Sequence, residues 1–204
     1  MLRVGLTGGI ACGKSTVAEM LVQRGAHFLS ADALAHETYA PGTATHGEIV
    51  RRFGLEILDS DGTVNRKRLA NVVFPDRIAE LNAVVHPVVI EAQNRWMREV
   101  ERADPHGIAV VEAALLLEAG ADRDFDKVIV VTCGFEQKVE RYAARMRIPM
   151  EAARVEVERR SAAQMSDQEK ARRADYVVEN SGSVATLERQ VDEVWRKLKS
   201  CNAQ

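Results

Sequence analysis

The chain has 204 residues, of which 46% are hydrophobic, and its 28 basic and 30 acidic residues leave a formal net charge of -2. This size predicts one main globular domain with a sizeable core and room for inserted subdomains. The near balance of charge argues against a general nucleic-acid binder, which would be basic overall.

Segments that would indicate secretion or a membrane are not expected. The three cysteines are odd in number and lack CxxC spacing, which disfavours a disulfide framework or a zinc site and predicts a reducing cytoplasm. Residues 1–9 lack a signal-peptide pattern. The most apolar run, residues 108–119, is interrupted by Glu112 and Glu118 and is too short to span a bilayer.

Five short apolar segments rich in Val and Ile alternate with helical patterns along the chain. They lie at residues 2–7, 26–30, 107–112, 126–132 and 175–179. Continuous apolar strands separated by helices predict a parallel sheet that is covered on both faces.

Several predicted helices have recognisable ends. A helix at residues 15–24 is stopped by Gly25, and Pro87 is typical of a first helical position capped by His86. Ser166 and Glu169 form a capping box, and an apolar stripe predicts a last helix from about residue 183. Residues 34–104 and 136–173 show helical patterns without a convincing sheet strand.

The strongest motif follows the first strand. It is the GxxxxGK[ST] pattern made by Gly8, Gly9, Ile10, Ala11, Cys12, Gly13, Lys14 and Ser15. Glycines let successive backbone N–H groups wrap a triphosphate, and the following helix directs its positive end at the same phosphates. Lys14 is expected to reach the β- and γ-phosphates of ATP, and the Ser15 hydroxyl to bind Mg²⁺.

A phosphate loop alone does not separate kinases from nucleotide switches. The chain lacks the NKxD sequence with which GTPases read guanine. Residues 59–62 match DxxG, but they are interpreted as a polar turn because no buried strand precedes them. An ATP-dependent kinase is therefore favoured.

A kinase also needs a group that handles the proton of the acceptor hydroxyl. Asp32 follows the second strand, and the carboxyl ends of strands line the ligand crevice in such sheets. It is a candidate catalytic base, or else the N-cap of a helix that starts at Ala33. From its position alone the two interpretations are equally good.

Arginines gather in the second helical stretch. Arg141 and Arg145 are four residues apart and share a helix face, so a mobile lid could bring them to the charge that develops on the transferred phosphoryl group. The alternative is a solvated face whose arginines pair with neighbouring glutamates.

An ordered set of short motifs resembles the dephospho-coenzyme A kinase family over nearly the whole chain. The set comprises Leu6-Thr7-Gly8-Gly9-Ile10 leading into Gly13-Lys14-Ser15-Thr16, then Ala31-Asp32, Phe53-Gly54, His86-Pro87, Leu115-Leu116-Leu117-Glu118 and Asn180-Ser181-Gly182. The resemblance implies an α/β fold: a P-loop NTPase core with a five-stranded parallel sheet, a helical coenzyme A-binding insertion and a helical lid. The corresponding ranges are 1–33 with 105–135 and 174–204 for the core, 34–104 for the insertion and 136–173 for the lid.

The same resemblance implies the activity. ATP, with Mg²⁺, would phosphorylate the ribose 3′-hydroxyl of dephospho-coenzyme A, in a monomer or weak homo-oligomer without nucleic-acid or membrane partners. Asp32 matches the catalytic aspartate, Thr16 extends the phosphate loop, Arg141 matches a lid position that meets ATP, and Asn180 is implied near the adenine. His86 is either a substrate contact or a helix cap, and Glu118 either borders the substrate pocket or caps a turn at Gly120.

Two departures from the family pattern stand out. Ser30 replaces an aspartate that the family usually carries two residues before Asp32, which removes a second carboxylate from beside the proposed base. Ala114 replaces a frequent proline. The rival functions are a kinase for another nucleoside or nucleotide and a non-enzymatic nucleotide switch.

Overall fold

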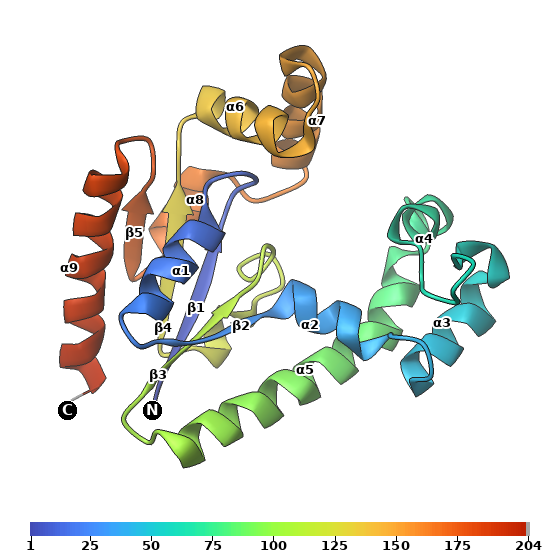
Figure 1. Ribbon diagram of the computed structural model, residues 1–204, viewed down its shortest axis with the longest axis horizontal. Coiled ribbons are helices and arrows are strands. Elements are labelled where there is room, and N and C mark those ends of the chain that lie inside the picture. Colours follow the sequence, from blue (N-terminus) through green and yellow to red (C-terminus); the bar gives the residue numbers. More distant parts are fainter. Residues whose placement is uncertain (203–204) are drawn as a thin grey trace. The chain divides into compact units, whose positions relative to one another are not determined.

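The computed structural model describes residues 1–202 of the chain (Figure 1). The strands are β1 (Leu2–Gly8), β2 (His27–Ser30), β3 (Ile108–Glu112), β4 (Lys127–Thr132) and β5 (Tyr176–Glu179). The helices are α1 (Lys14–Gln23), α2 (Ala31–Thr38), α3 (Ala44–Phe53), α4 (Arg66–Val73), α5 (Ile78–Ala103), α6 (Phe135–Met146), α7 (Met150–Ala162), α8 (Asp167–Arg173) and α9 (Val184–Asn202), with single 3₁₀ turns at Leu55–Ile57 and Ala121–Asp124.

The five strands form one sheet in the order β2-β3-β1-β4-β5. The pairings of β1 with β3, of β1 with β4 and of β4 with β5 are parallel, and Leu6 on β1 stands opposite Glu112 on β3. The predicted α/β class and five-stranded parallel sheet are therefore confirmed. Each predicted strand agrees with the structure to within one residue at either end.

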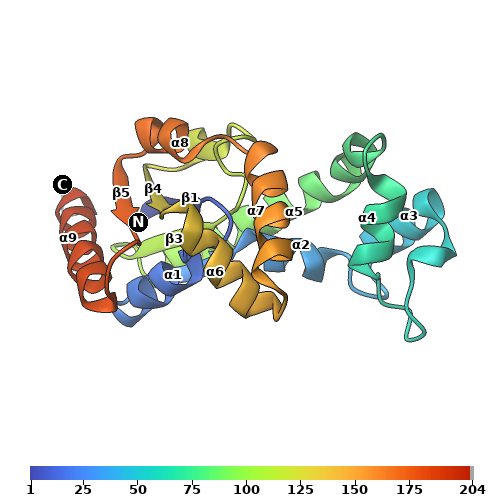
Figure 2. The same ribbon diagram turned by 90° about the horizontal axis from the view of Figure 1, so that it is seen from above.

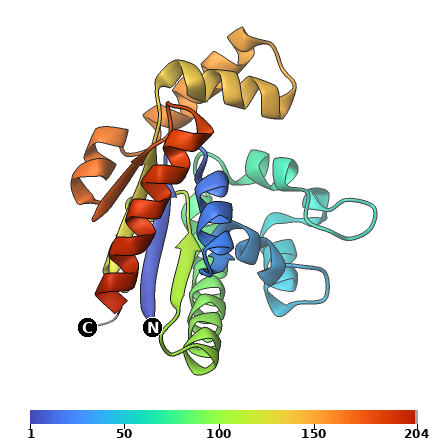
Figure 3. The ribbon, with the colours of Figure 1, turned by 60° about the vertical axis from the view of Figure 1, so that its left-hand side comes forward.

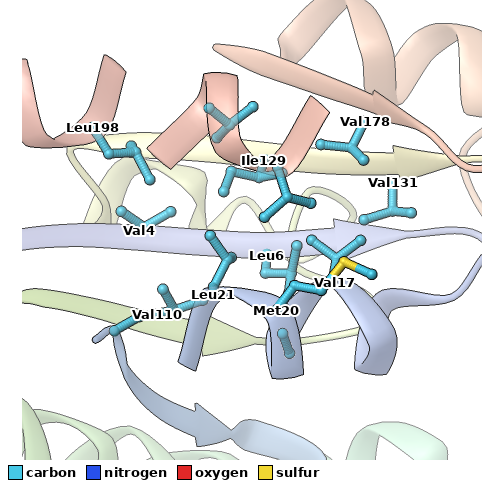
Figure 4. Packing of buried hydrophobic residues seen from close by; sticks show 14 of the residues in the cluster. Val4, Leu6, Val17, Met20, Leu21, Val110, Ile129, Val131, Val178 and Leu198 are labelled. Carbon is cyan, nitrogen blue, oxygen red and sulfur yellow. The ribbon is translucent and has the colours of Figure 1, made fainter. Parts of the chain in front are cut away.

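Both faces of the sheet are covered. On one face, α1 and α9 pack over β1 and β4, where Leu6, Leu21, Ile129 and Leu198 are almost completely buried (Figure 4). Helix α8 lies on the other side of the sheet from α1 and α9 (Figure 2). Met165 before this helix and Ala174 after it pack on a second cluster of buried residues that includes Val130. Burying a Leu or Ile side chain contributes roughly 1.5–3 kcal/mol, so this packing fixes β1 and the loop that follows it.

The chain from Ser30 to Glu99 forms a compact unit of its own, and Met1–Leu29 with the described chain from Val100 onward forms the other. The core of the Ser30–Glu99 unit is a cluster of Ile49, Phe53, Ile57, Leu69 and Val73. Apart from an isolated bridge between Leu58 and Val64, no strand occurs in the described residues 34–104, which confirms the predicted helical pattern there. The predicted division into core, insertion and lid stays a prediction.

The DxxG match is a turn, as the sequence analysis expects. Asp61 Oδ1 accepts hydrogen bonds from the amide and the hydroxyl of Thr63, and Gly62 takes a left-handed conformation with φ 82°. The segment belongs to the helical unit, so it does not follow a buried strand of the sheet.

The predicted helix start at Pro87 is wrong. Helix α5 runs without a break from Ile78 to Ala103 and carries Pro87 inside it, so His86 is a mid-helix residue and not a cap. Proline in a helix interior removes one backbone hydrogen bond and costs about 3 kcal/mol. Leu81, Val84 and other apolar residues that precede Pro87 in this helix pack on the cluster that contains Ile49 and Phe53. Their burial offsets the free-energy cost of the proline.

The ends of the other helices follow the expected rules. Ser166 and Glu169 form the predicted capping box of α8, and α9 buries Leu187, Val191, Val194 and Leu198. Helices α9 and α1 run side by side along the sheet (Figure 3). Within residues 1–202, none of the helices is both long and apolar enough to cross a membrane.

Candidate active site

The loop between β1 and α1 has the conformation that a phosphate-binding loop requires. Gly8 ends β1 with φ 152°, and a Cβ on it would stand 2.2 Å from the carbonyl oxygen of Val131 on β4. Gly13 caps α1 with φ 90°, where a Cβ would stand 2.2 Å from Asn180 Nδ2. Only glycine fits either position, because the neighbours leave no room and the backbone is left-handed at Gly13.

Lys14 lies at the first position of α1 and folds back over the loop. Its Nζ donates to the carbonyl oxygens of Gly8 at 3.1 Å and of Gly9 at 3.2 Å. Ser15 follows at the second position of the helix. The helix N-terminus, the loop amides and one ammonium group therefore converge on the same region, which is the arrangement that binds a polyphosphate.

Ile10 joins the loop to the helical hairpin α6–α7. Its side chain is buried in a small cluster with Val139 and Tyr142 of α6 and with Ala153 and Val157 of α7. The sequence predicts this segment as a lid, and Figure 1 shows it beyond the end of the sheet from which the loop projects. The packing of Ile10 makes the loop and the hairpin parts of one structure.

Asn180 follows β5 and fastens the loop from the other side. Its side chain is buried, and Nδ2 donates to the carbonyl oxygen of Cys12 at 2.8 Å. The backbone N–H of Asn180 donates to the carbonyl oxygen of Thr132, also at 2.8 Å. The resemblance places Asn180 near the adenine. Its contacts in this structure are with the phosphate loop, and its role toward the nucleotide stays a prediction.

Arg141 of α6 lies against the same asparagine. Its Nη2 donates to the Asn180 carbonyl oxygen at 2.8 Å. Its Nη1 is buried and, among the described residues, has no hydrogen-bond partner. That atom lies 3.9 Å from the place where a Cβ on Gly13 would stand. A buried guanidinium nitrogen without an acceptor beside the end of a phosphate loop suits an incoming phosphate or nucleotide oxygen.

The other arginines of the stretch behave differently. Arg145 stacks on the Tyr142 ring at 5.4 Å, while Arg159 and Arg160 both pair with Glu156. These two pairs hold the pKa of Glu156 at about 2, first through the hydrogen bond from Arg159. The alternative of a paired, solvated face is therefore right for Arg159 and Arg160, and it does not describe Arg141.

A third cation lies at the loop beside Lys14 and Arg141, and it was not predicted from the sequence. Lys138 of α6 is 7% exposed and donates to Asp167 Oδ2 of α8 at 2.6 Å. A Cβ on Gly9 would stand 3.0 Å from Lys138 Nζ. The available signal was its spacing, because Lys138 precedes Arg141 by three residues and so shares its helix face. No signal pointed to Asp167, which lies 29 residues further on.

Asp32 is not a helix cap. Helix α2 starts at Ala31, and its N-cap is Ser30, whose side chain accepts a hydrogen bond from the Ala33 amide at 3.3 Å. Asp32 stands in the first turn with an exposed side chain. Serine and aspartate cap helices about equally well. Ser30 therefore keeps the cap while lacking the carboxylate that the family pattern carries at this position.

Asp32 and Arg66 both lie in the electrostatic neighbourhood of His36. Burial and the positive charge of Arg66 lower the pKa of His36 below its ordinary value, and the Asp32 carboxylate opposes that shift. His36 Nδ1 also hydrogen-bonds the Tyr39 hydroxyl. The Asp32 carboxylate is exposed and interacts with His36 of the same helix, and its catalytic role stays a prediction.

Glu118 caps no turn at Gly120, because the amides of Gly120 and Ala121 donate to backbone carbonyl oxygens. Its Oε1 instead accepts from the Met165 amide at 3.0 Å and lies 2.9 Å from Lys170 Nζ. The Lys170 side chain is 0% exposed. This ion pair ties the segment after β3 to α8, and the predicted substrate contact of Glu118 stays a prediction.

We expect Glu118→Ala to lower the free energy of unfolding by about 3 kcal/mol, since removing one partner of a buried pair strands the other charge. Urea unfolding measures the change. The matched double variant Glu118→Leu with Lys170→Met should recover most of the loss, because neither charge is then buried. If Glu118→Ala is as stable as the wild type and only its acceptor KM rises, Glu118 is a substrate contact and not a structural partner.

Mg²⁺ binds ATP chiefly through phosphates and waters and takes few protein oxygens. The donor set here fits that habit. The residues that would be available to such an ion are Ser15, with a hydroxyl at the second position of α1, and Glu112, with a carboxylate at the last position of β3. Taken together, the parallel sheet, the glycine loop with Lys14, and Arg141 define a P-loop nucleotide-binding protein.

Comparisons with known proteins narrow this class. A family model described as dephospho-CoA kinase matches residues 2–186. A dephospho-CoA kinase of Geobacter sulfurreducens is 43% identical over 196 residues, which is 95% of this chain and 97% of the relative.

Solved structures agree. A crystal structure of a Thermus thermophilus protein has a TM-score of 0.79 and 35% identity, with 97% of each chain covered. A dephospho-CoA kinase from Campylobacter jejuni has a TM-score of 0.69 and 26% identity, with 98% of each covered. The chain belongs to the dephospho-CoA kinase family.

Proposed function

We propose that this protein transfers the γ-phosphate of ATP to the ribose 3′-hydroxyl of dephospho-coenzyme A, which yields coenzyme A and ADP in the last step of coenzyme A biosynthesis. The observation that carries the proposal is the family match over nearly the whole chain. It is supported by a loop after β1 that has the conformation a phosphate-binding loop requires, with glycine at both tight positions. A P-loop kinase uses ATP as its co-substrate.

The donor half of the reaction falls to the loop and α6. The loop amides and Lys14 bind the β- and γ-phosphates of ATP. Thr16 lies at the third position of α1, in the same first turn as Lys14 and Ser15. Arg141 supplies to an oxygen of ATP its Nη1, which has no hydrogen-bond partner within residues 1–202. Mg²⁺, which Ser15 would help to hold, neutralises charge on the phosphates when it is bound.

Asp32 is the residue that would act on the acceptor hydroxyl. A carboxylate at this position can accept the proton of the 3′-hydroxyl, or orient the hydroxyl for in-line attack on the γ-phosphorus. We assign the helical stretch 34–104, including His86, to binding of the long acceptor. Glu118 is assigned to the border of the pocket that holds this acceptor. A small-molecule acceptor, a monomer or weak homo-oligomer, a cytoplasmic location and the absence of nucleic-acid partners belong to the same proposal.

The acceptor is tested by following ADP release with Mg²⁺-ATP and one acceptor at a time, with each product identified by mass. Dephospho-coenzyme A should give the highest kcat/KM. AMP and adenosine should react poorly, because they lack the pantetheine arm whose binding energy positions the ribose.

The panel also separates the rival functions. A higher kcat/KM with AMP or a free nucleoside would make the protein a kinase of another acceptor. ATP binding without phosphorylation of any acceptor would make it a nucleotide switch.

A further inference from the structure

Two cations on one face of α6 bracket the phosphate loop. Lys138 and Arg141 are three residues apart, which places both side chains on the same side of the helix. Lys138 Nζ lies near Gly9 at the head of the loop, and Arg141 Nη1 lies near Gly13 at its end. The two groups therefore face different parts of a bound polyphosphate.

Lys14 identifies which part lies at the head of the loop. In P-loop proteins this lysine reaches the β- and γ-phosphates. Here its Nζ is held by the carbonyl oxygens of Gly8 and Gly9. Lys138 approaches the same residue, Gly9, from α6, so it stands on the side of the loop where the terminal phosphate of ATP belongs.

A carboxylate shares this position. Asp167 Oδ2 accepts from Lys138 at 2.6 Å, and its Oδ1 lies 2.8 Å from where a Cβ on Gly9 would stand. Burial by itself lowers the pKa of Lys138, but the hydrogen bond to Asp167 and nearby negative charge outweigh it, so the pKa lies above its ordinary value. The ammonium is charged, and its anionic partner sits at the head of a loop built for anions.

We propose that Lys138 is a further donor-binding residue, which contacts the γ-phosphate of ATP, and that Asp167 is the exchangeable partner that holds Lys138 beside Gly9 until the phosphate takes its place. The carboxylate oxygens occupy a location where phosphate oxygens would satisfy the same ammonium. Asp167 has 26% of its side chain exposed, which leaves it a path to water when it yields Lys138.

The proposal is tested by calorimetric titration of Mg²⁺-ATP and of Mg²⁺-ADP without acceptor. In Lys138→Met the Kd for ATP should rise about 10-fold, the loss typical of one charge-assisted hydrogen bond. The Kd for ADP should change by less than about 2-fold, since ADP has no γ-phosphate. Asp167→Asn removes a competing negative charge, so its Kd for ATP should stay at the wild-type value or fall.

Lys127→Met is the matched control. Lys127 pairs with Asp175 at 3.0 Å, at the start of β4 and thus at the opposite end of that strand from the loop. It should leave the ratio of the two Kd values unchanged. Circular dichroism of each variant verifies folding, and Lys138→Arg should restore much of the preference for ATP.

Two results would overturn the proposal. One is a Kd ratio in Lys138→Met equal to that of the wild type. The other is an equal loss of ATP affinity in Lys138→Met and Asp167→Asn, which would make the pair a structural tie between α6 and α8. The inference rests on the proposed function only in taking ATP as the donor, so a different acceptor in the panel would leave this test intact.

Discussion

Replacing Asp32 by asparagine should lower kcat with dephospho-coenzyme A by about 10²–10⁴-fold, the usual range for loss of a general base. The substitution keeps the size of the side chain and removes both its charge and its capacity to accept a proton. Helix α2 should persist, because its N-cap is Ser30 and not Asp32. Steady-state kinetics and an ATP titration measure the effect, and the Kd for ATP should change little.

The matched control is Glu37→Gln, which removes an exposed carboxylate from the same helix. Its kcat should equal that of the wild type. If Asp32→Asn also keeps the wild-type kcat, another group handles the proton of the acceptor hydroxyl, and the role assigned to Asp32 is wrong.

Lys14→Ala should reduce turnover by roughly 10³-fold, because one positive charge that faces the transferring phosphoryl group is lost. The fold should survive. Lys14 is at the start of α1, and its Nζ donates to the carbonyl oxygens of Gly8 and Gly9 in the loop. Turnover with Mg²⁺-ATP and the thermal unfolding midpoint measure the two effects separately.

Lys197→Ala serves as the control for Lys14→Ala. Lys197 pairs with Glu193 on the outer surface of α9, and more than half of each side chain is exposed. Its removal should affect neither quantity, since exposed pairs contribute only about 0–1 kcal/mol. Wild-type turnover in a folded Lys14→Ala protein would contradict the role of Lys14 at the phosphates.

The prediction for Lys14 concerns a loop that is held by parts of the chain remote in sequence. Val131 packs against Gly8, Asn180 bonds to Cys12, and Ile10 is buried against α6 and α7. These contacts fix the backbone amides before any phosphate arrives, and such preorganisation is what makes a polar site effective in phosphoryl transfer.

Much of the frame follows from local pattern alone. The apolar segments of β1, β3 and β4 are readable because residues buried on both faces of a sheet are continuously apolar. The edge strands β2 and β5 are less buried and were found from their Val, Ile and other apolar residues between helical patterns. The phosphate loop is equally readable, since the glycine at position 13 is demanded by its left-handed backbone. The capping box of α8 is also local, because Ser166 and Glu169 satisfy each other's amides within one turn.

Local rules failed where burial outweighed them. Pro87 predicts a helix start, yet α5 continues through it because apolar residues of that helix pack on a common cluster.

Asp32 and Ser30 are both residue types that cap helices well, and their types alone did not decide which of them would cap α2.

Within the phosphate-binding unit, the sequence by itself determined the strands and the phosphate loop with Lys14 and Ser15, because each depends on neighbours along the chain. Only the tertiary structure decided the partners of the charged groups. Lys138 meets Asp167, Lys170 meets Glu118, and Arg141 meets Asn180 across separations of 29 to 52 residues. Such pairings depend on which helix faces pack together. A buried charge must find its partner there, since burying it unpaired costs several kcal/mol.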